Sequence, residues 1–340
     1  MPKLPTRPLG RTGLPVTILG FGGAPLGDLY ERLDEAAAIE TVATAHELGM
    51  TLFDTSPHYG NGLSELRFGA ALRRVPRDSY VLSTKVGRRM NPRMPGSSVG
   101  GPGFAGGVPH ASIVDYSYDG TLRSFEQSLL RLGTDRIDIL LLHDVDIWTH
   151  GPDMVEQRFR EAMEGAYRAV HELREQGVIK AIGVGLNECA ITVRFAKEGD
   201  FDCVLLAGRY SLLHQDALDE FLPLAERKGI GVILGGIYNS GILATGATPD
   251  ARFNYRPAPP EVMERVSRIE RVCAAHGVPI AVAALHFVLG APAVASVILG
   301  GVTPAEVERN VAALAADVPA ALWSDLKSEG LLPDAVLVPA

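Results

Sequence analysis

The sequence predicts an α/β fold, a (β/α)8 (TIM) barrel with long loops at one end. Short apolar, β-branched runs alternate with amphipathic helical patterns along the whole chain. Eight such runs can be counted, and they are almost continuously hydrophobic, as parallel strands covered on both faces are. No linker-like stretch interrupts the alternation, so we expect a single barrel domain over residues 1–340.

The expected strands are residues 17–23, 51–56, 80–86, 137–144, 180–186, 202–209, 231–237 and 294–301. Several of the helical patterns between them close on a glycine, as helix C-caps do: Gly49, Gly133, Gly177, Gly229 and Gly277. An open dinucleotide-binding sheet would carry G-x-G-x-x-G after its first strand. The glycines of residues 20–27 lack that spacing, which favours the barrel.

Two connections between an expected strand and the following helix are long and irregular. Residues 87–110 and 244–261 are rich in Gly and Pro and show no periodicity. They can be tolerated surface insertions. In a barrel, however, the loops after strands form the ligand-binding face, and long ones often act as lids.

Composition excludes several classes of protein. The net charge is −8, and no Lys- or Arg-rich run suggests a nucleic-acid partner. The three cysteines share no metal-ligand spacing, and the N-terminus lacks an apolar signal segment. The least charged stretch, residues 279–302, is better explained by a buried helix and strand than by a membrane span. We therefore expect a cytoplasmic protein without membrane or nucleic-acid partners, either a monomer or a weak homo-oligomer.

Polar side chains stand where three successive expected strands end. Asp54 closes the second strand with Tyr59 just beyond it, Lys85 lies at the end of the third, and His143 at the end of the fourth. Each alone has an ordinary explanation, such as a turn former, a surface lysine or a hydrogen-bonded core histidine. In a barrel, the carboxyl ends of neighbouring strands share one face, so these four side chains should converge.

The four side chains have complementary chemistry. A phenol with a pKa of about 10 exchanges protons poorly at neutral pH. A nearby ammonium favours the phenolate, and a carboxylate can hold that ammonium in place. An imidazole can orient a substrate oxygen or relay a proton. The set suits proton transfer to or from an alcohol or carbonyl, contains no metal triad, and requires an organic cofactor for the hydride.

Together these motifs resemble the aldo-keto reductase superfamily. The likeness runs from LGRTGLPVTILGFGG (9–23) through FDTSPHYGNGLSE, VLSTKVGR and SLLRLGTDRIDILLLHD to GGVTPAEVERN (300–310). It implies a nicotinamide-dependent barrel enzyme acting on a small molecule. It also implies Tyr59 as general acid/base, Lys85 and Asp54 as the pair that tunes it, and His143 as the residue that positions the substrate oxygen. His58 is a candidate substrate contact.

The resemblance also assigns a cofactor site. It implies Asn187 at the nicotinamide carboxamide and NSGIL (239–243) at the pyrophosphate, whereas Gly235 stands where many relatives carry a stacking tyrosine. The expected cofactor contacts are Gly22, Asn187, Arg209, Asn239, Ser240, Gly241, Leu243, Gly300, Gly301, Thr303, Glu306, Arg309 and Asn310.

The same comparison predicts NAD rather than NADP. NADP-using relatives end the eighth strand with Lys-Ser followed by an Arg, and here Gly300, Gly301 and Glu306 take these places. Losing two charge-assisted contacts, each contributing about 1.5–3 kcal/mol, disfavours NADP. Glu306 can accept the ribose 2′-hydroxyl, or it can be an ordinary first-turn helix residue. Arg309, one turn further on, could reach a phosphate.

Within the superfamily, the chain resembles a subgroup of aldose C1 dehydrogenases, acting on L-fucose, D-threo-aldoses or L-galactose, and pyridoxal 4-dehydrogenase. Both activities oxidise a cyclic hemiacetal to a lactone, and we expect the aldose activity first. Three alternatives stay open: a general aldehyde or ketone reductase, a lyase or isomerase using Lys85 as a Schiff-base amine, and a slow redox-sensing binding protein. Recognition depends on loops 24–32, 87–118 and 145–158, where Tyr30 and Trp148 either stack on the substrate or pack in a lid.

Overall fold

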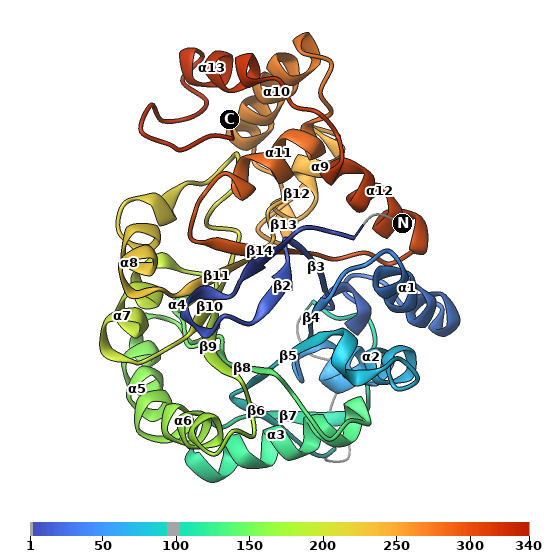
Figure 1. The fold of residues 1–340 in the computed structure, drawn as a ribbon, viewed down its shortest axis with the longest axis vertical. Helices are drawn as coiled ribbons and strands as arrows, with labels where there is room; N and C mark the ends of the chain where they lie inside the picture. The colour runs from blue at the N-terminus through green and yellow to red at the C-terminus, as the bar shows by residue number, and fades with distance from the viewer. Residues whose placement is uncertain (1–2, 94–102, 340) are drawn as a thin grey trace.

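Eight parallel strands form a closed barrel in the computed structural model, which describes residues 3–93 and 103–339 (Figure 1). Each strand pairs with the next around the ring, and β14 pairs with β3 to close it. The predicted fold class is therefore confirmed. The strands are β3 (Leu19–Gly22), β4 (Leu52–Asp54), β5 (Val81–Val86), β8 (Ile139–His143), β9 (Ala181–Leu186), β10 (Cys203–Ala207), β11 (Gly231–Gly235) and β14 (Val294–Leu299).

Helices surround this barrel and bury their apolar faces against the outer side of the strands (Figure 1). Gly133 and Gly229 end α3 and α8 in the left-handed conformation that a C-cap requires, as predicted. The surrounding helices are α1 (Glu35–Glu47), α2 (Leu63–Leu72), α3 (Tyr118–Leu132), α5 (Pro152–Glu161), α6 (Tyr167–Glu175), α7 (Cys189–Glu198), α8 (Phe221–Lys228), α11 (Ile280–Leu289) and α12 (Pro304–Leu314). Four more are α4 (Ile147–His150), α9 (Ile242–Thr245), α10 (Pro260–Ala275) and α13 (Ala320–Ser328).

The least charged stretch forms α11 followed by β14, both mostly buried inside the protein. This confirms the prediction of a buried helix and strand. Within the described residues, no single helix has the length and apolar character to cross a membrane; α10 and α11 reach that threshold only as a pair, bent by 93°.

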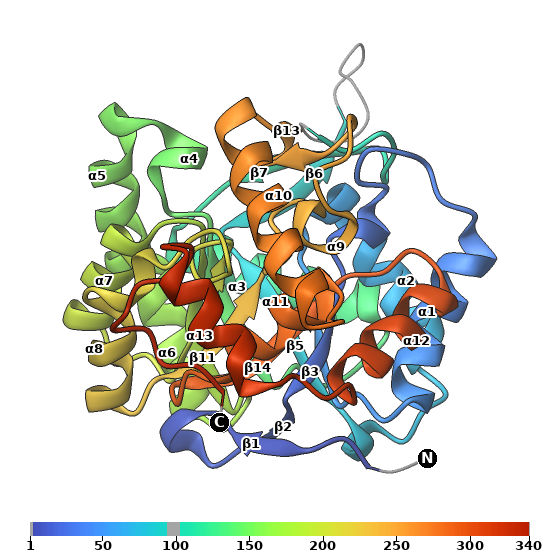
Figure 2. The same cartoon turned by 90° about the horizontal axis from the view of Figure 1, so that it is seen from above.

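The N-terminal end of the barrel is closed by a hairpin of β1 (Thr6–Pro8) and β2 (Pro15–Thr17) (Figure 2). Side chains that fill the barrel interior above it are apolar and tightly enclosed. They come from alternate positions of the strands, since successive residues of a strand face opposite sides. This interior cluster consists of Leu9, Val16, Leu52, Val81, Ile139, Leu141, Ala181, Cys203, Leu205, Ile233, Ala295 and Ile298.

Both irregular insertions build antiparallel hairpins at the opposite end of the barrel (Figure 2). The first pairs β6 (Arg88–Pro92) with β7 (His110–Val114), and its residues 94–102 lie outside the described part of the chain. The second pairs β12 (Arg252–Phe253) with β13 (Arg256–Pro257) around a two-residue turn. In that turn Asn254 and Tyr255 both have positive φ, 48° and 63°, a conformation matching the twist of tight hairpins.

Candidate active site

A buried ion pair lies where β4 and β5 end. Lys85 Nζ is 2.6 Å from Asp54 Oδ2 and donates a second hydrogen bond to the backbone oxygen of Thr55 at 2.7 Å. Ser83 Oγ donates to the other Asp54 oxygen at 2.8 Å. Both charged side chains are 1% exposed. Burial raises the pKa of Asp54, and the neighbouring ammonium offsets part of that rise. The pair can stay charged only because each member satisfies the other.

Tyr59 reaches the same place from the turn after β4. It begins a 3₁₀ turn, Tyr59–Gly62, in which Gly60 has φ 61° and approaches the backbone of Gly27 so closely that a Cβ would lie 2.5 Å from its oxygen. A glycine is therefore required for this turn. The Lys85 ammonium lies 4.9 Å from the centre of the Tyr59 ring. The predicted convergence of phenol, ammonium and carboxylate is present in the structure.

The predicted direction of the Tyr59 pKa is wrong. We expected the ammonium of Lys85 to lower it, but the pKa of the phenol is raised well above its usual 10.0. Burial is the main cause, the charges of Asp54 and Asp144 add to it, and Arg88 opposes it. The charge of Lys85 is paired with Asp54 at 2.6 Å and does not outweigh burial of the phenol. The resting side chain is a protonated phenol.

His143, the last residue of β8, completes the set. Its ring lies 5.9 Å from that of Tyr59 at an interplanar angle of 87°. Nδ1 is 3.1 Å from Ser56 Oγ, and Nε2 is 3.3 Å from Asp144 Oδ1. Burial holds the pKa of His143 well below its usual value, so the imidazole is neutral. A neutral ring can donate a hydrogen bond through one nitrogen while accepting through the other.

Three of the four side chains open into one cavity of about 1400 Å³. Tyr59, Lys85 and His143 line it, and so do both insertion hairpins. The predicted substrate contacts His58, Tyr30 and Trp148 lie on its wall together with Phe104 and Tyr255. His58 packs edge-on against Phe104 at 5.5 Å, and burial lowers the pKa of His58 to about 4. The wall around the reacting groups is therefore rich in aromatic rings.

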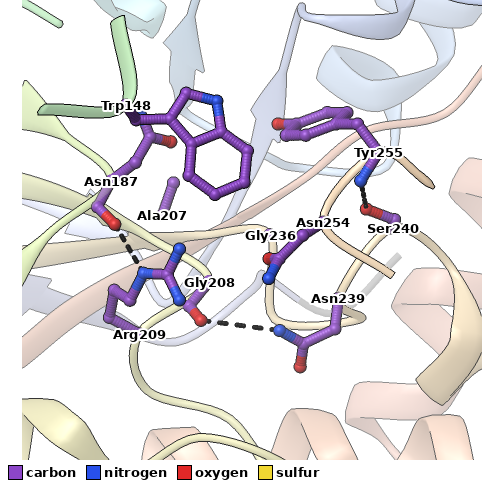
Figure 3. Close-up of a pocket in the computed structure, with 10 residues that line it drawn as sticks. All are labelled: Trp148, Asn187, Ala207, Gly208, Arg209, Gly236, Asn239, Ser240, Asn254 and Tyr255. Atoms are coloured by element: carbon purple, nitrogen blue, oxygen red, sulfur yellow. Dashed lines mark hydrogen bonds between the residues drawn. The ribbon is translucent and has the colours of Figure 1, made fainter. Parts of the chain in front are cut away.

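A smaller pocket continues this cavity over the ends of β10 and β11 (Figure 3). Four predicted cofactor contacts line it, namely Asn187, Arg209, Asn239 and Ser240. Arg209 Nε donates to the backbone oxygen of Asn187 at 2.5 Å, and Ser240 Oγ accepts from the backbone N–H of Tyr255 at 2.9 Å. Trp148 and Tyr255 face one another 6.4 Å apart on the same wall. Both rings line the pocket and offer aromatic surface to a planar group.

The remaining predicted cofactor residues lie outside that pocket. Gly22 ends β3, Gly241 precedes α9, and the Leu243 side chain lies in the hydrophobic core. Thr303 caps α12, whose exposed first turns carry Arg309 and the partly buried Asn310.

Glu306 has a local role of its own, because its Oε2 accepts the backbone N–H of Val302 at 2.9 Å. Arg309 Nη2 lies 3.9 Å from its other oxygen. This is the ordinary role considered for Glu306 in the sequence.

Two charged side chains of the site were absent from the predicted set. Asp144 directly follows His143, and Arg88 stands in the first insertion; Arg88 Nη1 lies 2.8 Å from Asp144 Oδ2. Both line the cavity. Asp144 could have been found from its position at the strand end. Its partner Arg88 comes from an insertion without periodicity, so no sequence signal indicated the contact. In the described part of the chain, no group of three or more His, Cys, Asp or Glu residues could hold a metal ion.

Comparisons with known proteins agree with this geometry. Residues 18–328 match the Aldo/keto reductase family. The chain is 41% identical over 335 residues to pyridoxal 4-dehydrogenase of Microbacterium luteolum, covering 96% of this chain and 97% of the relative. It is 37% identical over 325 residues to D-threo-aldose 1-dehydrogenase of a Pseudomonas species, covering 94% and 96%. The holo form of aldo-keto reductase AKR11C1 from Bacillus halodurans is a structural neighbour with a TM-score of 0.76 and 26% identity, covering 98% of both chains.

Proposed function

Because this chain belongs to the aldo/keto reductase family and is an oxidoreductase that uses a nicotinamide cofactor, we propose that it oxidises a cyclic hemiacetal to a lactone. The preferred substrate is an aldose of the L-fucose, D-threo-aldose or L-galactose type, oxidised at C1. The observation that carries this proposal is the cluster of Tyr59, the Lys85–Asp54 pair and neutral His143 in one cavity. These groups handle a proton on a C–O group and supply no nucleophile.

Each residue has one task in the reaction. The hemiacetal hydroxyl gives its proton to the oxygen of Tyr59 in its phenolate form, while His143 donates a hydrogen bond that orients the same hydroxyl. Lys85, fixed by Asp54 and Thr55, places a positive charge 4.9 Å from the phenol ring as negative charge develops there. A nicotinamide cofactor, when bound, would supply the acceptor for the hydride of the substrate carbon. Asn187, Arg209, Asn239 and Ser240 would hold it in the pocket that continues the cavity.

Pyridoxal is the second candidate substrate, since its internal hemiacetal reacts in the same way. The relative named pyridoxal 4-dehydrogenase shares 41% identity with this chain. The aromatic residues Tyr30, Phe104, Trp148 and Tyr255 on the cavity wall suit a pyridine ring as well as a sugar face. Buried Arg88 offers a positive charge to a phenolic oxygen.

We further propose that NAD is preferred over NADP. A Cβ at position 300 would lie 2.6 Å from Pro25 Cγ, so this chain has no room for a lysine side chain at that point. Glu306 adds a carboxylate beside the start of α12, where a phosphate would otherwise gain from the helix N-terminus. We expect kcat/KM to favour NAD by about 10²–10⁴-fold.

The double variant Gly301→Ser with Glu306→Arg tests this preference. Position 301 tolerates a Cβ, whose nearest neighbour would be Val307 Cγ2 at 3.4 Å. The variant should move kcat/KM toward NADP, and Glu308→Arg, two residues further along α12, is the matched charge control. A wild type that prefers NADP, or a double variant no more tolerant of NADP than the control, would refute the proposal.

The substrate is tested by following NADH formation with purified protein on a panel of aldoses and pyridoxal. We expect turnover on at least one aldose with lactone as the product, and faster turnover at alkaline pH because a proton is released. A kcat/KM for pyridoxal a hundredfold above that for any aldose would move the proposal to the second candidate, since that ratio corresponds to about 2.7 kcal/mol. Turnover below about 0.1 per second on the whole panel would favour a binding protein.

A further inference from the structure

The residue after the end of β8 places a carboxylate against the imidazole of His143. Asp144 is 8% exposed and has φ 54°, a left-handed conformation that is uncommon for a residue other than glycine. Its Oδ1 lies 3.3 Å from His143 Nε2, and its Oδ2 lies 2.8 Å from Arg88 Nη1. A strained backbone of this kind is retained when the surrounding contacts require it.

The carboxylate of Asp144 is ionised. Burial opposes its ionisation, but attraction to the imidazole of His143 and to the guanidinium of Arg88 outweighs burial and holds the pKa of Asp144 below its usual range. Asn187 Nδ2 donates a further hydrogen bond to Oδ1 at 3.3 Å. An ionised carboxylate only accepts hydrogen bonds, so it favours a proton on the ring nitrogen that faces it.

The opposite side of the imidazole does not select a tautomer. His143 Nδ1 is 3.1 Å from Ser56 Oγ, and a hydroxyl can either donate to that nitrogen or accept from it. Ser56 Oγ already accepts the backbone N–H of His58 at 3.1 Å and keeps its own proton free to donate. The carboxylate of Asp144 is thus the group that decides between the two tautomers of His143.

We propose that Asp144 is a positioning residue that fixes His143 as the Nε2–H tautomer, with Ser56 donating to Nδ1. Oδ1 lies 3.3 Å from Nε2 but is not aligned with the ring N–H, so its charge favours a proton on Nε2 while that N–H stays open to the cavity that both residues line, where a substrate oxygen arrives. Arg88 keeps the carboxylate charged, and Asn187 holds its orientation. The catalytic consequence rests on the proposed function, in which His143 donates to the hemiacetal oxygen. The tautomer itself can be measured without substrate.

Asp144→Asn tests this, because the amide has nearly the same shape but can donate to Nε2 and so favours the other tautomer. Protein labelled with ¹⁵N-histidine is examined by long-range ¹H–¹⁵N NMR, with the His143 signals assigned from their loss in His143→Gln. We expect the proton to lie on Nε2 in the wild type and to move toward Nδ1 in Asp144→Asn. We expect kcat to fall about 10- to 100-fold with KM nearly unchanged, and Asp144→Glu to recover part of the loss.

Asp146→Asn is the matched control. Asp146 is also buried, but its carboxylate caps α4 and accepts the backbone N–H of Asn187, so the His143 signals should stay as in the wild type. If Asp144→Asn does not fold, Arg88→Met with Asp144→Asn removes the unpaired buried charge, and the same two readouts apply.

An unchanged tautomer in the folded Asp144 variant would overturn the proposal, as would a changed tautomer with wild-type kcat. Absence of turnover on every hemiacetal would instead count against the proposed function, because the NMR result stands without it.

Discussion

Two side chains of β4 differ in their surroundings. Leu52 packs in the apolar barrel interior, whereas Asp54, two positions later, lies at the C-terminal end of the strand. β5 runs in the same way from Val81 to Lys85, and β8 from Ile139 to His143. The N-terminal half of the barrel is thus closed by apolar side chains and a hairpin, whereas the C-terminal half ends in charged side chains around a large cavity. On each strand, two or four positions separate the packing residue from the residue of the site.

The two ends differ in what burial does to the free energy of the fold. Apolar groups in the interior stabilise the folded state by about 25 cal/mol per Å² removed from water. The Lys85–Asp54 pair is equally buried, but desolvation of two charges offsets much of their attraction. Burial at the closed end of the barrel therefore stabilises the fold. The buried Lys85–Asp54 pair at the open end adds little stability and is present because of its function. The following variants test that division.

Tyr59→Phe should have the largest effect. Removing the phenol oxygen removes the group that exchanges the proton, so kcat should fall by about 10²–10⁴-fold. The dissociation constant for NAD, measured by titration calorimetry, should change little, because the ring remains. Retention of wild-type turnover would show that Tyr59 is not the group that exchanges the proton.

Lys85→Met should damage both activity and stability. It leaves Asp54 buried without its partner, so we expect a loss of about 3–5 kcal/mol in the free energy of unfolding measured with urea. The double variant Lys85→Met with Asp54→Asn removes the unpaired charge and should recover most of that stability while remaining inactive. If the double variant regained activity, the ion pair would have only a structural role.

Ile139→Ala is the matched change at the closed end. Ile139 is fully buried in the barrel interior, so the loss should be about 2–5 kcal/mol in the free energy of unfolding. The kcat of the folded fraction should stay close to that of the wild type. A fall in kcat comparable to that of Lys85→Met would contradict the division between the two ends.

The last of these predictions concerns the pH dependence of kcat for oxidation. Accepting a proton requires the phenolate, and burial raises the pKa of Tyr59, so the phenolate fraction is small near pH 7 and grows up to tenfold per pH unit above it. Burial lowers the pKa of His143, which therefore stays neutral and adds no inflection. Rates measured from about pH 7 to 9 at saturating substrate should rise, and a falling profile would assign the proton to another group.

The strand pattern predicted all eight barrel strands to within a few residues, because parallel strands buried on both faces leave a continuous apolar signal. The pattern also predicted that Asp54, Lys85 and His143 lie together, since strand ends share one face of a barrel. The direction of the Tyr59 pKa was missed because it depends on burial and on the compensation of Lys85 by Asp54. Arg88 and Tyr255 come from insertions whose hairpins have no periodic signature, so their contacts could not be predicted.

The central claim, that the open end of the barrel moves a hydride from a hemiacetal carbon to the cofactor, can be measured directly. L-fucose deuterated at C1 and pyridoxal deuterated at its hemiacetal carbon are each incubated with the enzyme and NAD, and the products are examined by mass spectrometry. We expect each NADH formed to carry one deuterium and the lactone to have lost its deuterium. With Tyr59→Phe, we expect no more than a trace of either product. NADH without deuterium, or a deuterated lactone, would contradict it.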